Sequence, residues 1–213
     1  MTGRRIGRRA ALVGLGAAGA VAAAPLGRAL AQESETELAL GLFAQGDPEA
    51  PVKVIEFASL TCPHCATFHT EVYPQLKRDY VDTGKIRMEF REVYFDRLGL
   101  YAGMLARCGG EQRYFGFISL LLERQEEWAR TETPEDLLET FSRYGRQVGL
   151  SDERVRACLA DEAGQRALVE QYREYYEDPR LTGTPTLVVD GDKVADWSFE
   201  SLSSAIDAAL GES

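Results

Sequence analysis

The stretch VKVIEFASLTCPHC, residues 52–65, decides the fold. Its first half, Val52–Ala58, is an apolar run that predicts a buried strand. Two cysteines, Cys62 and Cys65, follow after a short loop, which places both thiols at the first turn of the next helix. The unpaired backbone N–H groups and the dipole of a helix start stabilise negative charge. Since the thiolate is the reactive form of cysteine, this position favours a redox centre.

A Cys-X-X-Cys pair alone permits a redox pair or half of a zinc site. Pro63 suits the first helical position, and the sequence has no second pair to complete a four-sulfur zinc site. We expect Cys62 to be the exposed nucleophile and Cys65 the shielded resolving thiol. His64 can give the Cys62 thiolate a hydrogen bond or a positive charge, and a low pKa makes Cys62 a good leaving group. His69 is predicted to lie on the surface.

Residue patterns predict strands at both ends of the mature chain. The segment before residue 46 should carry one short edge strand, and alternating residues after Gly84 predict a half-buried strand. Asp190-Gly191 predicts a hairpin turn. The expected strands are Leu38–Phe43, Val52–Ala58, Ile86–Phe90, Thr186–Val189 and Lys193–Ala195.

Most of the remaining sequence shows helical patterns. The helix from Cys62 contains Pro74, which should kink it, and a final apolar stripe ends at Gly211. The helices expected between the strands are Leu98–Cys108, Glu111–Glu127, Pro134–Val148, Asp152–Leu159 and Asp161–Glu177. This order indicates an α/β domain, residues 32–95 and 180–213, interrupted by an all-helical domain, residues 96–179.

The first 31 residues are typical of a signal peptide. A start with four arginines, Arg4, Arg5, Arg8 and Arg9, leads into the apolar stretch Ala10–Ala24, and cleavage is predicted after Ala31. The paired arginines favour twin-arginine export, with Sec export or an uncleaved anchor as alternatives. The mature chain has a net charge of −15 against −10 for the whole sequence, which argues against nucleic acid as a partner.

Three motifs carry a family resemblance. Together, Cys62-Pro63-His64-Cys65, Glu56-Phe57-Ala58-Ser59 and Gly183-Thr184-Pro185-Thr186 resemble the DsbA family of periplasmic thiol–disulfide oxidoreductases, in order and spacing over residues 46–210. The resemblance implies a thioredoxin fold with a helical insertion and an acidic, oxidising cysteine.

The resemblance also implies roles for three further residues. Pro185 should follow a cis peptide bond and face Cys62, and the backbone of Thr184 should pair with an extended substrate peptide. Glu56 should be a buried acid that helps to move the proton of the shielded cysteine. The alternatives are a trans turn proline and a Glu56 that faces water from an edge strand.

The two remaining cysteines, Cys108 and Cys158, are expected to form a structural disulfide, because Cys62 and Cys65 use the other two. Two buried free thiols are the alternative.

The predicted function is that of a periplasmic dithiol oxidase with no cofactor beyond its redox-active disulfide. Its substrates would be reduced exported proteins, and by resemblance a DsbB-like membrane quinone reductase would reoxidise it. We expect a monomer, because residues 32–46 are too few for an N-terminal dimerisation domain. The alternatives are an isomerase or reductase of the same fold and, in a different class, a thiol-based metal-binding protein.

Overall fold

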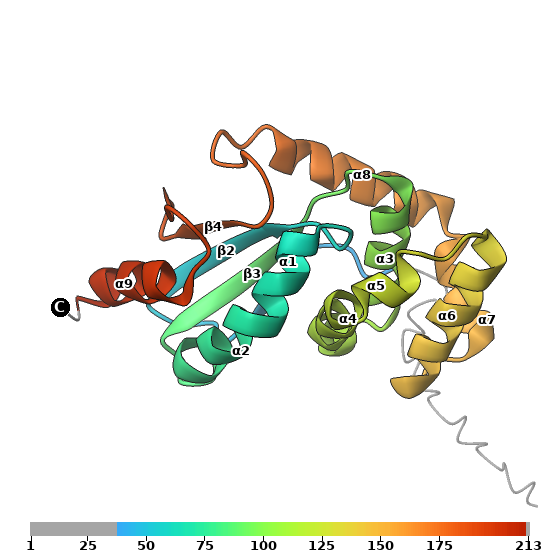
Figure 1. The fold of residues 1–213 in the computed structure, drawn as a ribbon, viewed down its shortest axis with the longest axis horizontal. Coiled ribbons are helices and arrows are strands. Elements are labelled where there is room, and N and C mark those ends of the chain that lie inside the picture. The colour runs from blue at the N-terminus through green and yellow to red at the C-terminus, as the bar shows by residue number, and fades with distance from the viewer. Residues whose placement is uncertain (1–37, 212–213) are drawn as a thin grey trace, which may run out of the picture. The chain divides into compact units, whose positions relative to one another are not determined.

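The computed structural model describes residues 38–211 (Figure 1). The predicted signal peptide and its cleavage site at Ala31 lie outside the described residues. Within residues 38–211, no helix has the length and apolar character needed to cross a membrane.

A five-stranded mixed sheet forms the centre of the fold, with strand order β1-β3-β2-β4-β5 (Figure 1). The central strand β2 runs parallel to β3 and antiparallel to β4, and the edge strands β1 and β5 are antiparallel to their neighbours. Because both faces of β2 are covered, its apolar residues are buried, as the sequence predicts. The bounds are β1 Ala44–Gln45, β2 Val52–Ala58, β3 Ile86–Glu92, β4 Thr186–Val189 and β5 Asp192–Lys193.

The short edge strand predicted near Leu38–Phe43 is present but displaced: it is β1, directly after these residues. The backbone there is interrupted at Gly41, whose φ is +117°. Two carbonyls of this segment, those of Ala39 and Gly41, accept hydrogen bonds from the buried Arg107 at 3.0 Å instead of pairing with a strand. Strand pairing therefore begins only at β1. The return strand β5 is also shorter than the predicted Lys193–Ala195.

The helix that follows the cysteines alternates between α and π turns. The Tyr73 N–H bonds to the Phe68 carbonyl, a π-type spacing of five residues, just before Pro74, which has no N–H to continue the α pattern. The sequence therefore predicts the disturbance at Pro74 but not its π geometry. The turns are α1 Pro63–Thr67, η1 Phe68–Val72, α2 Tyr73–Leu76 and η2 Lys77–Val81.

Six helices occupy the chain between β3 and β4, and α9 packs on the sheet after β5 (Figure 1). Thr133 and Ser151 cap α6 and α7 through their hydroxyls. The predicted helix Glu111–Glu127 is divided at Arg124, where the backbone leaves helical geometry. The bounds are α3 Arg97–Cys108, α4 Glu111–Glu123, α5 Gln125–Trp128, α6 Pro134–Gln147, α7 Asp152–Leu159, α8 Glu162–Tyr176 and α9 Phe199–Leu210.

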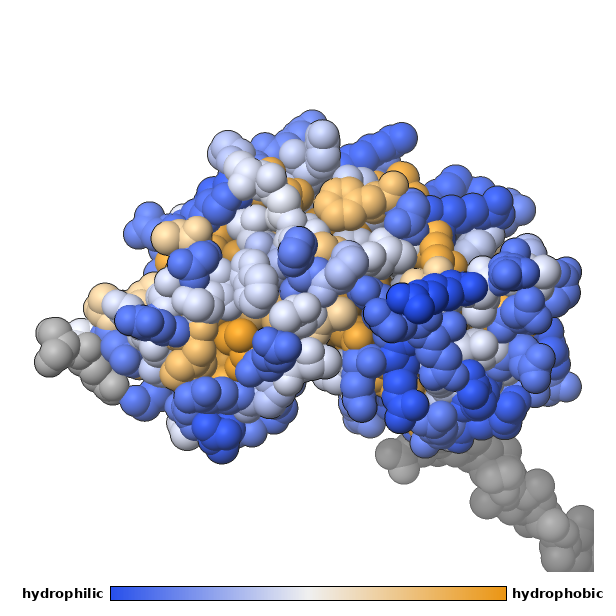
Figure 2. All heavy atoms as spheres, viewed as in Figure 1, coloured by the Kyte–Doolittle hydropathy of each residue, from blue (hydrophilic) through white to orange (hydrophobic). Residues whose placement is uncertain are grey.

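A disulfide joins α3 to α7. Cys108 and Cys158 are bonded with Cα atoms 5.8 Å apart, which confirms the predicted pairing over the alternative of two free thiols. The face made by α6 and α7 is covered with hydrophilic side chains (Figure 2). The helical block therefore has its own internal cross-link, while its boundaries as a separate domain stay a prediction.

Candidate active site

Cys62 and Cys65 lie at the start of α1, beyond the end of β2. Cys62 is the N-cap residue with extended backbone, and Pro63 occupies the first helical position, as predicted. Cys62 is half-buried, whereas Cys65 is fully buried among the core residues around Phe90 and Tyr114. Both are free thiols in this structure. Only Cys62 is therefore accessible to a partner.

The two thiols differ strongly in acidity. The Cys65 side chain, helped by the Thr184 side chain and by the backbone N–H groups of Cys65 and His64, lowers the pKa of Cys62 from 9.0 to about 5 against partial burial. Burial raises the pKa of Cys65, and the neighbouring Cys62 and the charge of Glu56 raise it further. At neutral pH the site therefore holds a thiolate at Cys62 and a thiol at Cys65.

The low pKa of Cys62 predicts how the stability of the reduced protein depends on pH. The pKa of Cys62 is lower in the folded protein than in the unfolded chain, so the thiolate stabilises the reduced fold fully above pH 9.0. That stabilisation is expected to shrink as the pH falls and to be lost below about pH 5. Thiolate absorbance in the ultraviolet, with Cys62→Ser as the baseline, measures the midpoint. A midpoint at the ordinary value of a free thiol would contradict the arrangement.

His64 contributes to the site through its backbone. Its N–H is among the groups that lower the pKa of Cys62. Its exposed imidazole lies near Trp197, with the ring centroids 6.4 Å apart. The predicted hydrogen bond or charge from the imidazole to the Cys62 thiolate stays a prediction.

The loop before β4 faces Cys62. The Thr184–Pro185 peptide bond is cis, and the Cys62 Sγ lies 3.3 Å from the Thr184 carbonyl oxygen. The predicted cis proline and its position opposite Cys62 are thus confirmed. A hollow beside this loop is lined by Thr184, Pro185 and Trp197, among others. An extended peptide lying along the Thr184 backbone would bring its own sulfur to Cys62.

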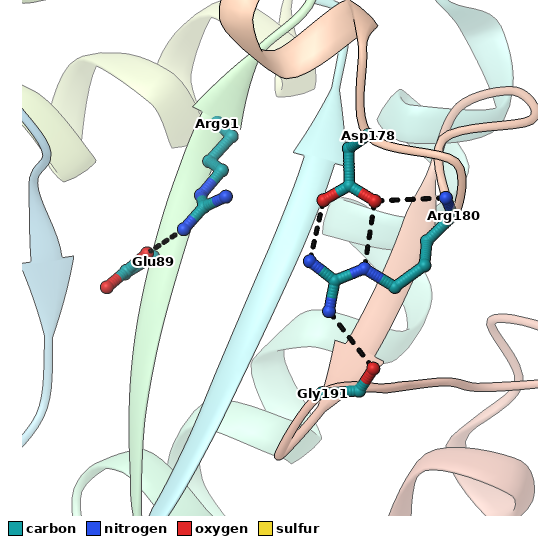
Figure 3. A network of polar contacts seen from close by, with 5 residues as sticks. All are labelled: Glu89, Arg91, Asp178, Arg180 and Gly191. Atoms are coloured by element: carbon teal, nitrogen blue, oxygen red, sulfur yellow. Dashed lines mark hydrogen bonds and ion pairs between the residues drawn. The ribbon is translucent and has the colours of Figure 1, made fainter.

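A polar tether holds the chain that leads into this loop (Figure 3). The Arg180 guanidinium donates to both carboxylate oxygens of Asp178, at 2.9 and 2.6 Å, and to the Gly191 carbonyl at 3.0 Å. Gly191 lies in the turn between β4 and β5, so the tether fixes the segment before Thr184 to the far end of that hairpin. Asp178 and Arg180 carry no distinctive sequence signal, because an isolated Asp-X-Arg resembles any surface ion pair.

Residues of the segment between β3 and β4 hold the loop before Cys62 in place. The Gln125 side-chain amide on α5 donates to the carbonyls of Leu60 and Cys62 at 2.7 and 3.0 Å. The Thr61 hydroxyl donates to the Asp96 carboxylate at 2.8 Å. A glutamine at the first position of a short helix carries no sequence signal for this contact, which joins residues more than 60 positions apart.

Glu56 is fully buried on β2, which excludes the alternative of an edge position facing water. The prediction that His69 lies on the surface is wrong. Its imidazole is buried, and its Nε2 lies 3.0 Å from both carboxylate oxygens of Glu56. A surface position was expected because a helix start cannot easily direct His69 and the residues of the cysteine motif to one metal ion. His69 instead lies four residues after the buried Cys65, on the same helix face, and its partner is on β2.

Groups of three or more His, Cys, Asp or Glu side chains placed to hold a metal ion do not occur within residues 38–211.

Comparison with known proteins agrees with this geometry. A family model described as thioredoxin matches residues 40–208. The chain belongs to the thioredoxin family. Among solved structures, this thioredoxin-family chain is similar to alpha-DsbA1 of Wolbachia pipientis, with 28% identity, a TM-score of 0.72, and coverage of 84% of this chain and 96% of that one. The resemblance to DsbA proteins and the thioredoxin fold are thus confirmed.

Two further relatives carry informative names. A protein-disulfide isomerase of Novosphingobium aromaticivorans has a TM-score of 0.72 and 26% identity, covering 82% of this chain and all of that one. A Rickettsia bellii protein named as a protein-disulfide oxidoreductase is 34% identical over 169 residues, which is 79% of this chain. The chain spans 64% of the length of that relative and 59% of a second one from Rickettsia felis.

Proposed function

We propose that this protein is a thiol–disulfide oxidoreductase that acts as a dithiol oxidase on exported proteins. The observation that carries the proposal is the unequal pair of thiols. Cys62 is accessible with a pKa of about 5, and Cys65 is buried with a raised pKa. A thiolate stabilised to this degree favours the reduced enzyme, so its disulfide passes readily to a partner.

The exchange uses both sulfurs in turn. A substrate thiolate attacks Cys62 in the Cys62–Cys65 disulfide, forms a mixed disulfide and releases Cys65, which takes up a proton. A second substrate thiolate then attacks the substrate sulfur of the mixed disulfide and releases Cys62 as a thiolate. Thr184 and the cis Pro185 would hold the extended substrate beside Cys62. No cofactor beyond the disulfide is needed for these steps.

The setting of the reaction is part of the proposal. A signal peptide ending at Ala31 would deliver the chain to the periplasm, where disulfides persist. The reduced enzyme needs an oxidant there, and a DsbB-like membrane quinone reductase has the required chemistry. We propose that the protein acts as a monomer.

The name of the Novosphingobium relative makes isomerase activity the second candidate. The equilibrium of the Cys62–Cys65 pair with glutathione discriminates between the two. A strongly oxidising potential, above the ~−180 mV typical of protein disulfide isomerase, is expected for an oxidase. A potential near the ~−270 mV of thioredoxin would overturn the proposal. Because Cys108–Cys158 could also respond, the measurement should follow the Cys62–Cys65 peptides by mass spectrometry.

A further inference from the structure

The buried contact between Glu56 and His69 has no role in the exchange as written above. One nitrogen, His69 Nε2, lies 3.0 Å from each of the two Glu56 carboxylate oxygens. The exposed fractions of the two side chains are 5% and 0%. The contact is therefore a buried hydrogen bond or ion pair that is shielded from solvent.

The chain reaches this contact through unusual local geometry. Phe68 and His69 lie three and four residues after the buried Cys65, so all three share one face of the helix, and all are buried. His69 also lies within the π turn over Phe68–Val72, and such turns in α-helices frequently mark functional sites. The imidazole is thus held against Glu56 of β2.

The surroundings of the imidazole are mostly aromatic. Its ring centroid lies 4.6 Å from that of Tyr73, 5.5 Å from that of Phe68 and 5.8 Å from that of Phe90. Among the described residues, His69 Nδ1 has no hydrogen-bond partner. The contact between Nε2 and Glu56 is thus the hydrogen bond that holds this ring. Glu56 is therefore the group with which the ring can exchange a proton.

Few titratable groups face the pair. Cys65 on α1 senses the charge of Glu56, which raises the pKa of its thiol. Tyr73 on α2 also senses Glu56, but its hydroxyl is occupied by Gln45. From the sheet, β3 contributes Phe90 and β4 contributes Leu187 opposite Glu56, and Tyr114 on α4 lies beyond Phe90. Of these groups, Cys65 is the one that must gain and lose a proton during exchange.

We propose that His69 is a positioning residue for this proton, and that the Glu56–His69 pair, rather than Glu56 alone, receives the proton of the Cys65 thiol and returns it. The inference rests on the proposed function and deepens it. The imidazole fixes the orientation of the carboxylate through Nε2.

The Cys65 proton moves when an external disulfide oxidises the reduced protein. The Cys62 thiolate attacks the disulfide, forms a mixed disulfide and expels one thiolate. The Cys65 thiol gives its proton to the Glu56–His69 pair, and its thiolate attacks the Cys62 Sγ. The Cys62–Cys65 bond forms, the bond between Cys62 and the external sulfur breaks, and a second thiolate leaves. Two electrons pass from the protein to the external disulfide.

The test uses the aromatic disulfide dithiobis-nitrobenzoate, whose released thiolates absorb visible light. In stopped flow, the first release reports the attack by Cys62 and the second, unimolecular release reports the attack by Cys65. The variants are His69→Leu, which removes the imidazole, and His69→Gln, which retains an N–H donor but does not titrate. Tyr73→Phe is the matched control, since it changes a buried ring neighbour of His69 and leaves the imidazole and the Glu56 carboxylate in place.

We expect the second release at pH 7 to slow about 100-fold in His69→Leu, the lower end of the usual contribution of proton transfer. In His69→Gln its pH profile should lose or shift its inflection. The first release and the Cys62 midpoint should stay within about twofold, and Tyr73→Phe should match the parent in both releases. If His69→Leu does not fold, the pH profile of His69→Gln decides.

The inference is overturned if both His69 variants keep the parent pH profile in the second release, or if Tyr73→Phe changes that profile equally. A failure of the proposed function looks different, because the first release at Cys62 would then be slow or absent in the parent protein as well.

Discussion

Cys62→Ser is expected to lower the rate at which the protein oxidises a reduced dithiol peptide by about a thousandfold or more, the scale on which removal of a nucleophile acts. The physical reason is the contrast between the two sulfurs. Cys62 is accessible and acidic, while Cys65 is fully buried with a raised pKa and cannot replace it. The loss of peptide thiols over time, starting from oxidised protein, measures the effect.

Cys65→Ser provides the matched comparison. It also lacks the stored disulfide, but it keeps the accessible thiolate at Cys62. Incubated with a peptide disulfide, Cys65→Ser should accumulate a stable mixed disulfide at Cys62, because the buried resolving thiol is absent. Cys62→Ser should form none. Mass spectrometry separates the two outcomes, and an adduct at Cys65 in Cys62→Ser would refute the assignment of the nucleophile.

Much of this site follows from local sequence. The apolar run of β2 and the Pro63 start of α1 are short-range signals, and the structure places both cysteines where those signals predict. The cis bond before Pro185 does not follow from local pattern. It was expected from the family resemblance, and the close approach of Thr184 to Cys62 explains its place in the site.

The predictions that failed did so for a common reason, which is that tertiary contacts altered the local pattern. At His69, the polar partner of the buried imidazole is Glu56 on β2, a contact between two elements that no local pattern shows. At Ala39 and Gly41, the carbonyls bind Arg107, which lies more than 60 residues away. Gln125 reaches the Cys62 loop over a similar separation.

Reduction of Cys108–Cys158 is expected to lower the free energy of unfolding by about 4 kcal/mol, the chain-entropy value for a loop of this length. The bond closes a sequence separation of 50 residues between α3 and α7, and both half-cystines are buried. The reduced unfolded chain gains conformational freedom that the oxidised chain lacks, which is why the effect falls mainly on the unfolded state.

The measurement needs a protein in which this disulfide is the one that responds to reductant. Cys62→Ala/Cys65→Ala provides it, and urea unfolding with and without reductant then compares the same sequence, so no cavity is introduced at α3 or α7. A difference below about 1 kcal/mol would contradict the entropic argument.

In the parent protein, selective loss of Cys108–Cys158 by double substitution should leave the Cys62 titration near pH 5, because that pKa depends on Cys65, Thr184 and the start of α1. Stability of the helical block and acidity of the nucleophile are thus expected to be separable properties.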